Sequence, residues 1–177
     1  STLFPSTTLF RSSSSPEPMP LVPALPDWLT DLPVAHRGLH DQTARVPENS
    51  LAAFRAAADA GYAMEFDVRL SADGVVMVFH DAKLARLTGR AGLVAETHAA
   101  ELRQMPLLGT GETIPTLAEV LQAIAGRVPL LIEVKNYGND SVGPMEEGVA
   151  AALATYPGPV AVPAAISVPQ GYAAMSF

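Results

Sequence analysis

Residues 64–81 read MEFDVRLSADGVVMVFHD, two apolar runs joined by a short polar segment. The first run, Met64–Val68, and the second, Val75–Phe79, each have the length of a buried strand. Only residues 69–74 separate them, and the Asp-Gly pair at residues 73–74 is a tight-turn signal. A parallel crossover needs about a dozen residues. We therefore expect the second run to fold back antiparallel on the first, which would carry His80 toward Glu65 and Asp67.

Outside this hairpin, short apolar runs alternate with segments of helical pattern. We expect strands at residues 34–36, 130–134 and 160–162, and helices after residues 47–50, over 116–125 and over 145–155. Asn49 or Ser50 can cap the first helix. Thr116 and Glu119 have the spacing of a capping box for the second. Strands that alternate with helices are typical of the α/β class with parallel strands.

Composition limits the function classes. The chain has 177 residues, enough for one domain of about 150 residues with appendages, and 49% of them are hydrophobic. Eighteen acidic against 11 basic side chains give a net charge of −7, and no basic stripe is visible, so we expect no nucleic-acid partner. The absence of cysteine excludes disulfides, thiolate metal sites and cysteine nucleophiles. The sequence contains no run of about 18 apolar residues, so we expect no transmembrane segment.

The two ends of the chain have unusual sequences. Residues 1–12, STLFPSTTLFRS, resemble a translated sequencing adapter, and we expect residues 1–18 to be a non-native or disordered leader. The domain would then span residues 19–177, with Met19 as its start. Prolines interrupt residues 157–169, and the last residues are apolar, so we expect the chain to stop inside a barrel domain. Without a secretory signal, a cytoplasmic location is expected.

Ionisable side chains recur where the expected strands end. They are His36 and Arg37, Glu65 and Asp67, His80 and Asp81, and Glu133 and Lys135. Glu65 and Asp67 are two residues apart on a strand, so their side chains share one face. Because the carboxyl ends of parallel strands meet at one edge of the sheet, we expect the whole set to gather there.

Such a cluster points to phosphodiester cleavage. Neighbouring carboxylates repel and raise one another's pKa unless a cation relieves them, and oxygen ligands favour Mg²⁺ or Ca²⁺. Arg37 suits a bidentate phosphate contact. His36 and His80 can act as an acid–base pair on nucleophile and leaving group. A metal, a guanidinium and an acid–base pair together are the requirements of this reaction.

Each feature alone has a simpler interpretation. His36 could be a core histidine, Glu133 with Lys135 an ion pair, and Asn49 or Ser50 only a helix cap. We expect His40 and His98 to be surface residues without partners. Asp81 is expected to orient its surroundings rather than to react. The functional interpretation gains weight because these features fall on one edge of the sheet.

The order of the motifs closely resembles the glycerophosphodiester phosphodiesterase family. The motifs are His36-Arg37-Gly38, Pro47-Glu48-Asn49-Ser50, Glu65-Phe66-Asp67-Val68, Asp73-Gly74, Val78-Phe79-His80-Asp81, Ile114-Pro115-Thr116-Leu117 and Ile132-Glu133-Val134-Lys135. The resemblance implies a (β/α)8 barrel of the phospholipase C-like phosphodiesterase type. It also implies metal-dependent hydrolysis of glycerophosphodiesters to sn-glycerol 3-phosphate and an alcohol such as choline, ethanolamine or glycerol.

The resemblance also implies a role for each matching position. Glu65, Asp67 and Glu133 would be the metal ligands, His36 and His80 the general acid and base, Arg37 the phosphate clamp, Lys135 a second positive group, and Glu48 a residue close to the substrate. A full barrel needs about 250 residues, so we expect about half a barrel, whose open edges would favour self-association. Two alternatives stay open: a phospholipase D-like phosphodiesterase of the same fold, whose secreted members usually carry disulfides, and an inactive phosphate-binding fragment.

Overall fold

The structure, a computed structural model, describes residues 27–135 and 143–162. The expected leader at residues 1–18 and the last residues of the chain, where we expect it to stop inside the barrel domain, lie outside the described residues. No helix in the described ranges has the length and apolar character that crossing a membrane requires.

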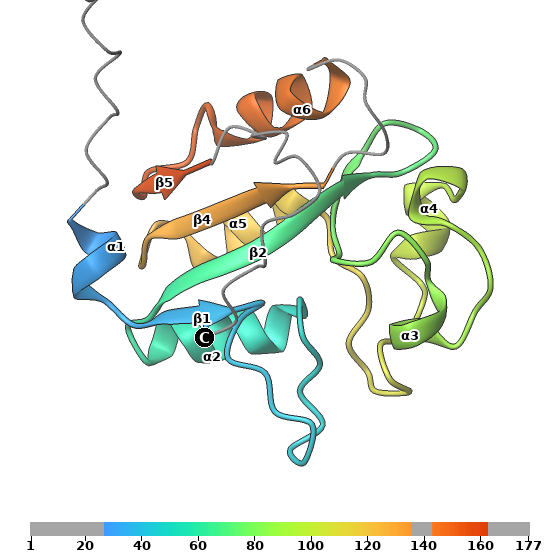
Figure 1. Ribbon diagram of the computed structural model, residues 1–177, viewed down its shortest axis with the longest axis horizontal. Helices are drawn as coiled ribbons and strands as arrows, with labels where there is room; N and C mark the ends of the chain where they lie inside the picture. The colour runs from blue at the N-terminus through green and yellow to red at the C-terminus, as the bar shows by residue number, and fades with distance from the viewer. Residues whose placement is uncertain (1–26, 136–142, 163–177) are drawn as a thin grey trace, which may run out of the picture.

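A mixed five-stranded sheet forms the centre of the structure (Figure 1). Its strands are β1 (Val34–His36), β2 (Ala63–Leu70), β3 (Val76–Val78), β4 (Leu130–Val134) and β5 (Val160–Ala161). The order is β1-β2-β4-β5 with every neighbouring pair parallel, and β3 pairs antiparallel with β2. The fold-back of the second run is thus confirmed. The expected strands at 34–36 and 130–134 are confirmed as well, and the last strand is one residue shorter than expected.

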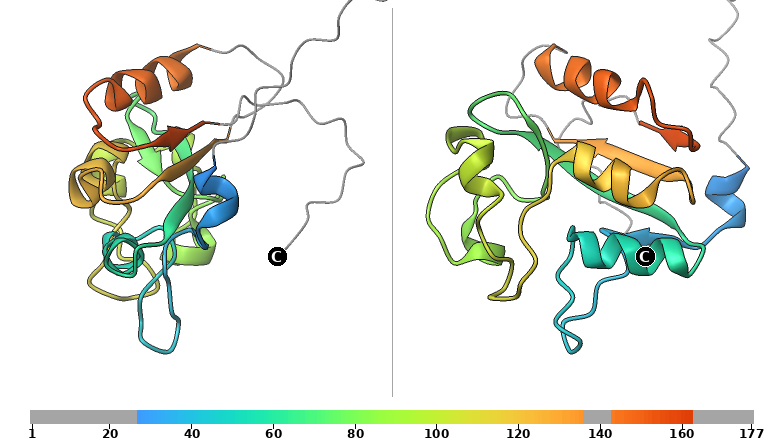
Figure 2. Two further views of the ribbon diagram at one scale, coloured as in Figure 1. Left: turned by 90° about the vertical axis from the view of Figure 1, so that its left-hand side faces the viewer. Right: turned by 180° about the vertical axis from the view of Figure 1, so that it is seen from behind.

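Helices α2 (Leu51–Asp59), α5 (Leu117–Ile124) and α6 (Pro144–Leu153) lie on one face of the sheet (Figure 2). Ser50, rather than Asn49, caps α2 by accepting a hydrogen bond from the Ala53 amide. Thr116 and Glu119 form the expected capping box of α5. Phe66 of the sheet and Phe54 of α2 meet edge to face at 5.2 Å within this main core. A short helix, α1 (Trp28–Asp31), precedes β1.

A second layer of structure follows β3. Residues 79–116, called the β3–α5 segment below, contain α3 (Ala85–Thr88), the 3₁₀ turn η1 (Val94–Glu96) and α4 (Ala99–Leu102), which the sequence pattern did not predict. The segment closes around its own hydrophobic cluster (Figure 1). The buried members of this cluster are Met77, Phe79, Leu84, Leu87, Val94, Ala99, Leu102, Met105, Leu107 and Ile114.

Candidate active site

The turn after β1 brings His36 and Arg37 to the edge of the sheet. His36 is the last residue of β1 and pairs in register with Glu65 of β2. The next two residues, Arg37 and Gly38, have φ of +59° and +79°. A Cβ at position 38 would lie 2.9 Å from the Cβ of Ala53 on α2, so only glycine fits this turn. The Arg37 amide donates to the Glu65 carbonyl oxygen at 2.7 Å, which fixes the turn against β2.

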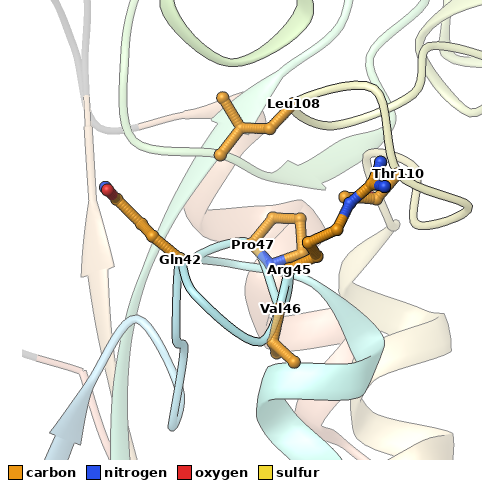
Figure 3. A pocket seen from close by; sticks show the side chains of 6 residues that line it. All are labelled: Gln42, Arg45, Val46, Pro47, Leu108 and Thr110. Carbon is orange, nitrogen blue, oxygen red and sulfur yellow. The ribbon is translucent and has the colours of Figure 1, made fainter.

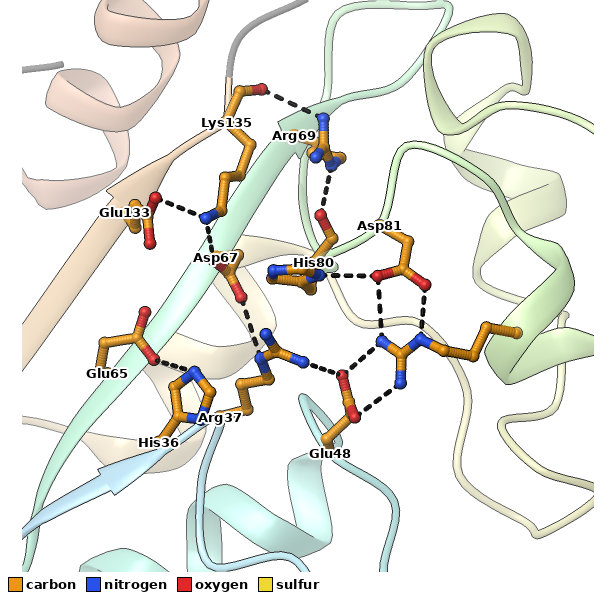
Figure 4. A network of polar contacts seen from close by, with 11 residues as sticks. His36, Arg37, Glu48, Glu65, Asp67, Arg69, His80, Asp81, Glu133 and Lys135 are labelled. Carbon is orange, nitrogen blue, oxygen red and sulfur yellow. Dashed lines mark hydrogen bonds and ion pairs between the residues drawn. The ribbon is translucent and has the colours of Figure 1, made fainter. Parts of the chain in front are cut away.

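Three carboxylates gather on the sheet face away from the helices (Figure 4). Met64, Phe66 and Val68 face the main core, so the alternate residues of β2 point the other way. Register places Asp67 opposite Glu133 of β4. Each of Glu65, Asp67 and Glu133 contributes an oxygen to a group whose members all lie within 4.8 Å of one another. The predicted clustering of these side chains is therefore present in the structure.

This cluster brings negatively charged side chains together in a partly buried environment. The Asp67 side chain is 1% exposed, and Oε2 of Glu65 and Oδ2 of Asp67 are buried without a hydrogen-bond partner among the described residues. Burial, reinforced by the charges of Asp67 and Glu133, raises the pKa of Glu65 to about 7. The two buried oxygens without a hydrogen bond among the described residues, together with the converging carboxylate of Glu133, are a donor set suited to a hard divalent cation.

Lys135 faces the carboxylates directly. Its Nζ donates to Oε1 of Glu133 at 2.5 Å and lies 3.2 Å from Oδ1 of Asp67. Although burial works against its charge, the hydrogen bond to Glu133 and the charge of Asp67 raise the pKa of Lys135 above its ordinary value. On the other side of the cluster, Nε of Arg37 lies 3.5 Å from Oδ2 of Asp67. Two basic side chains therefore flank the acidic group.

The return strand brings His80 beside the same group (Figure 4). The Phe79 amide donates to the Asp67 carbonyl oxygen at 3.0 Å, and Arg69 Nε donates to the His80 carbonyl oxygen at 2.7 Å. Nδ1 of His80 lies 2.7 Å from Oδ1 of Asp81, so Asp81 orients this ring as the sequence predicted.

His36 occupies the opposite side of the carboxylates. Its Nε2 lies 3.6 Å from Oε2 of Glu65, and its side chain is 66% exposed. Partial burial of the ring, together with the charge of Arg37, lowers the pKa of His36 below its ordinary value. The ring is therefore mostly neutral at pH 7, the form that accepts a proton.

Glu48 lies behind Arg37 and connects it to a residue that the sequence pattern did not indicate. Arg37 Nη1 donates to Oε1 of Glu48 at 2.8 Å. Arg86 of α3 donates to both oxygens of Glu48 and to both oxygens of Asp81. No sequence pattern indicated Arg86, because its partner Glu48 is 38 positions away and α3 is too short to show a helical period.

Other histidine and polar expectations have mixed outcomes. His40 is exposed, as expected. The expectation that His98 has no partner was wrong, since its Nδ1 lies 3.8 Å from Oδ2 of Asp73. Asn49 is fully buried, and neither of its amide atoms has a hydrogen-bond partner among the described residues.

A small cavity lies near the site but outside it (Figure 3). It holds about 60 Å³ and is lined by Gln42, Arg45, Val46, Pro47, Leu108 and Thr110. Arg45 closes one side by donating to the Gly109 carbonyl oxygen at 3.0 Å. A cavity of this size accommodates water rather than a phosphodiester.

Residues 36–157 match the sequence profile of the Glycerophosphoryl diester phosphodiesterase family. The chain belongs to this family. The matched range contains every predicted site residue from His36 to Lys135.

Individual proteins named as glycerophosphodiester phosphodiesterases are similar to the chain over part of their length. The chain is 40% identical over 92 residues to probable glycerophosphodiester phosphodiesterase 2 of Mycobacterium tuberculosis, covering 51% of this chain and 34% of that protein. It is 37% identical over 113 residues to a glycerophosphodiester phosphodiesterase of Caldanaerobacter subterraneus, covering 59% and 45%. The chain thus spans between a third and a half of the length of these relatives.

Solved structures of the family share the fold. A phosphodiesterase of Oleispira antarctica, in complex with the product sn-glycerol-3-phosphate, is 31% identical with a TM-score of 0.64, covering 76% of this chain and 58% of that one. A glycerophosphodiester phosphodiesterase of Thermotoga maritima is 31% identical with a TM-score of 0.60, covering 74% and 52%. The parallel strands and their helices are therefore the partial (β/α)8 barrel that the sequence predicted.

Proposed function

We propose that this protein hydrolyses glycerophosphodiesters to sn-glycerol 3-phosphate and an alcohol, and that it requires Mg²⁺ or Ca²⁺. The observation that carries the proposal is the convergence of three carboxylates, two histidines and Arg37 on one face of the sheet. The family membership supports it, as does the product, sn-glycerol-3-phosphate, bound to the similar phosphodiesterase of Oleispira antarctica.

Glu65, Asp67 and Glu133 would hold the divalent cation. The fit rests on their mutual distances and on the buried oxygens of Glu65 and Asp67, which have no hydrogen-bond partner among the described residues. When bound, the cation neutralises negative charge on the phosphate and on these carboxylates. Glu65, whose pKa is about 7, has to lose its proton before it can serve as a ligand.

Arg37 and Lys135 would bind the phosphate oxygens. Arg37 is held from behind by Glu48, and its guanidinium stands between Glu48 and the acidic cluster. Lys135 contributes a second positive charge beside Asp67 and Glu133. Two fixed cations that face a transferring phosphoryl group stabilise the charge that develops on its oxygens in the transition state.

His36 and His80 would supply the acid–base pair. Hydrolysis forms a bond from phosphorus to the attacking water oxygen and breaks the bond to the alcohol oxygen. One proton leaves the water, and one proton reaches the departing alcohol. The neutral ring of His36 is suited to accept a proton, and Asp81 directs Nε2 of His80 toward the substrate side.

The test is an enzyme-coupled assay of glycerol 3-phosphate released from glycerophosphocholine by the 177-residue chain with Mg²⁺, Ca²⁺ or EDTA. We expect release that EDTA abolishes. Release of choline from an acylated choline phospholipid, without cleavage of glycerophosphocholine, would instead favour the phospholipase D-like alternative. The acylated substrate is needed because hydrolysis of the phosphate–choline bond of glycerophosphocholine gives choline and glycerol 3-phosphate in either case. Binding of glycerol 3-phosphate without any release would favour the inactive phosphate-binding fragment.

Two further expectations remain proposals. We propose a cytoplasmic location, which fractionation of the source cells would test.

We also propose self-association through β1 and β5, the outermost strands of the described parallel sheet, because unpaired strand edges favour pairing with another chain. Sedimentation across a range of protein concentrations tests the second proposal, and a monomer at every concentration would contradict it.

A further inference from the structure

Arg86 joins two carboxylates that come from different parts of the chain. Its Nη1 and Nη2 donate to Oε2 and Oε1 of Glu48 at 2.9 and 2.8 Å. Its Nε and Nη2 donate to Oδ2 and Oδ1 of Asp81 at 2.6 and 3.1 Å (Figure 4). One planar guanidinium therefore makes four charge-assisted hydrogen bonds, a geometry that a lysine ammonium cannot provide.

Each of these carboxylates holds a candidate site residue on its other side. Oε1 of Glu48 accepts a hydrogen bond from Nη1 of Arg37 at 2.8 Å. Oδ1 of Asp81 lies 2.7 Å from Nδ1 of His80. The sequence of contacts from Arg37 through Glu48, Arg86 and Asp81 to His80 is continuous.

The backbone around Arg86 is anchored by buried neighbours, although the Arg86 side chain itself is 46% exposed. The neighbouring residues Leu84 and Leu87 are buried in the hydrophobic cluster of the β3–α5 segment, which also contains Phe79 next to His80. Exposed ion pairs usually contribute little to stability, with bidentate arginine–carboxylate geometry as the exception. The Glu48 and Asp81 side chains are only 13% and 22% exposed, so these contacts belong to the exception.

The charges around Arg86 argue against direct phosphate binding by this residue. Two carboxylates already surround its guanidinium, and both stay ionised. Hydrogen bonds from Arg86 lower the pKa of Asp81 to about 2. Burial raises the pKa of Glu48, but hydrogen bonds from Arg86 and Arg37 outweigh that effect and leave it below its ordinary value. Arg86 is therefore charge-compensated, and any effect on catalysis passes through Glu48 and Asp81.

We infer that Arg86 is a positioning residue, which fixes the phosphate-binding Arg37 and the proton-transferring His80 relative to each other by holding Glu48 and Asp81. The inference rests on the proposed function for the roles of Arg37 and His80. The β3–α5 segment is thereby part of the catalytic apparatus, since it carries the one side chain that bonds to both supporting carboxylates in the described part of the chain.

The experiment compares Arg86→Ala, Arg86→Lys and Arg103→Ala in the 177-residue chain. Arg103 is the matched control, because it is 51% exposed, pairs with Glu119 and lies on the neighbouring α4–α5 contact away from the site. We expect Arg86→Ala to lower kcat/KM by about 10- to 100-fold, as loss of an outer-shell partner typically does. The loss should be shared between a lower kcat, through His80, and a higher KM, through Arg37.

Arg86→Lys should recover only part of this loss, and Arg103→Ala should stay within about twofold of the wild type, the scale expected when a surface pair is removed. A double-mutant cycle, in which kcat/KM is compared for Arg86→Ala, Glu48→Gln and the variant that carries both changes, gives a second test. If Arg86 acts through Glu48, removing Arg86 has a smaller effect in the Glu48→Gln background than in the wild type. Unchanged kcat and KM in Arg86→Ala, or full additivity with both Glu48→Gln and Asp81→Asn, would overturn the inference.

A readout without turnover separates this inference from the proposed function. In a ¹⁵N-labelled chain, the Nε–H signal of Arg37 and the ring signals of His80 report whether these groups are held. Arg86→Ala should shift or broaden both sets of signals, whereas Arg103→Ala should leave them in place. If the wild type releases no glycerol 3-phosphate, the proposed function fails for this chain, and unchanged signals in Arg86→Ala would then refute the positioning role independently.

Discussion

The parallel strands and the β3–α5 segment hold their functional side chains in different ways. On the strands, Glu65, Asp67 and Glu133 are fixed by register, because the hydrogen bonds of the sheet set which residues stand opposite one another. In the segment, His80 lies in a bend after β3 and Arg86 lies on the one-turn helix α3, and both are held by side-chain contacts over a small separate core. The site lies where the two regions meet (Figure 4).

This difference separates two kinds of contribution to one site. A strand ladder places carboxylates close together even though they repel, and burial together with this repulsion raises the pKa of Glu65. The segment adds groups that reduce such repulsion, because Arg86 is shared between Glu48 and Asp81. We therefore expect changes to the three strand carboxylates to alter cation binding, and changes in the segment to alter catalysis with the cation still bound.

The largest effect is expected at the two histidines. His36→Ala and His80→Ala should each lower turnover by roughly two to four powers of ten, because each removes a proton-transfer group. Cation affinity should stay close to that of the wild type in both variants. Steady-state release of glycerol 3-phosphate checks the first point, and calorimetry checks the second. His98→Ala, an exposed histidine paired only with Asp73 among the described residues, is the control that should retain activity.

The two hydrophobic clusters can be compared with one phenylalanine from each. Phe66 and Phe79 are both fully buried, so truncation to alanine should cost about 3–5 kcal/mol at either position. Phe66→Ala weakens the main core and should lower the denaturant midpoint of the whole chain. Phe79→Ala should also increase hydrogen exchange selectively in residues 79–116. Uniform exchange in both variants would show that the two clusters unfold as one unit.

The pH dependence of stability should reveal Glu65. Because its pKa in the folded chain is about 7, above the ordinary carboxyl value, the folded state binds more protons than the unfolded state between about pH 4.5 and 7. Without divalent cations, the free energy of unfolding should fall as pH rises through this range, by up to about 3 kcal/mol. Chemical denaturation in EDTA measures this slope. Glu65→Gln should flatten it, and an equally steep slope in that variant would assign the dependence to another group.

The smallest effects are expected at the helix caps. Ser50→Ala and Thr116→Ala should each cost about 1 kcal/mol, because each leaves a helix amide without its side-chain partner. Only Ser50→Ala should also lower activity, since Ser50 donates to the Pro47 carbonyl oxygen and so supports the loop that carries Glu48. Equal retention of activity in both variants would mean that this loop tolerates the loss of the bond.

The contrast between the two regions also explains what the sequence could predict. Apolar runs such as residues 64–68 and 130–134 are long enough for their strand character to be visible, and their alternation with helical segments predicts that the strands run parallel. The sequence alone was therefore sufficient to place Asp67 and Glu133 on the same edge of the sheet. The capping residues Thr116 and Glu119 gave an equally local signal, which the structure confirms.

The elements of the β3–α5 segment could not be predicted, because they lack a local sequence pattern of this kind. Helices α3 and α4 contain four residues each, about one turn, which is too short to display a hydrophobic period. They depend on tertiary packing of residues such as Leu87 and Leu102 rather than on local propensity. The bridge from Arg86 to Glu48 depends on that packing, so no spacing in the sequence indicates it.

The most direct test of the account is a calorimetric titration of Mg²⁺ and Ca²⁺ into the wild-type chain, Glu133→Gln and Glu101→Gln. Glu133 is the exposed member of the carboxylate cluster, so its replacement should leave the fold intact, and Glu101 is an exposed glutamate on α4 outside the cluster. We predict one saturable cation site in the wild type and in Glu101→Gln, strongly weakened in Glu133→Gln. Absence of saturable binding in the wild type, or equal affinity in Glu133→Gln, would contradict the assignment of this edge of the sheet as a metal centre.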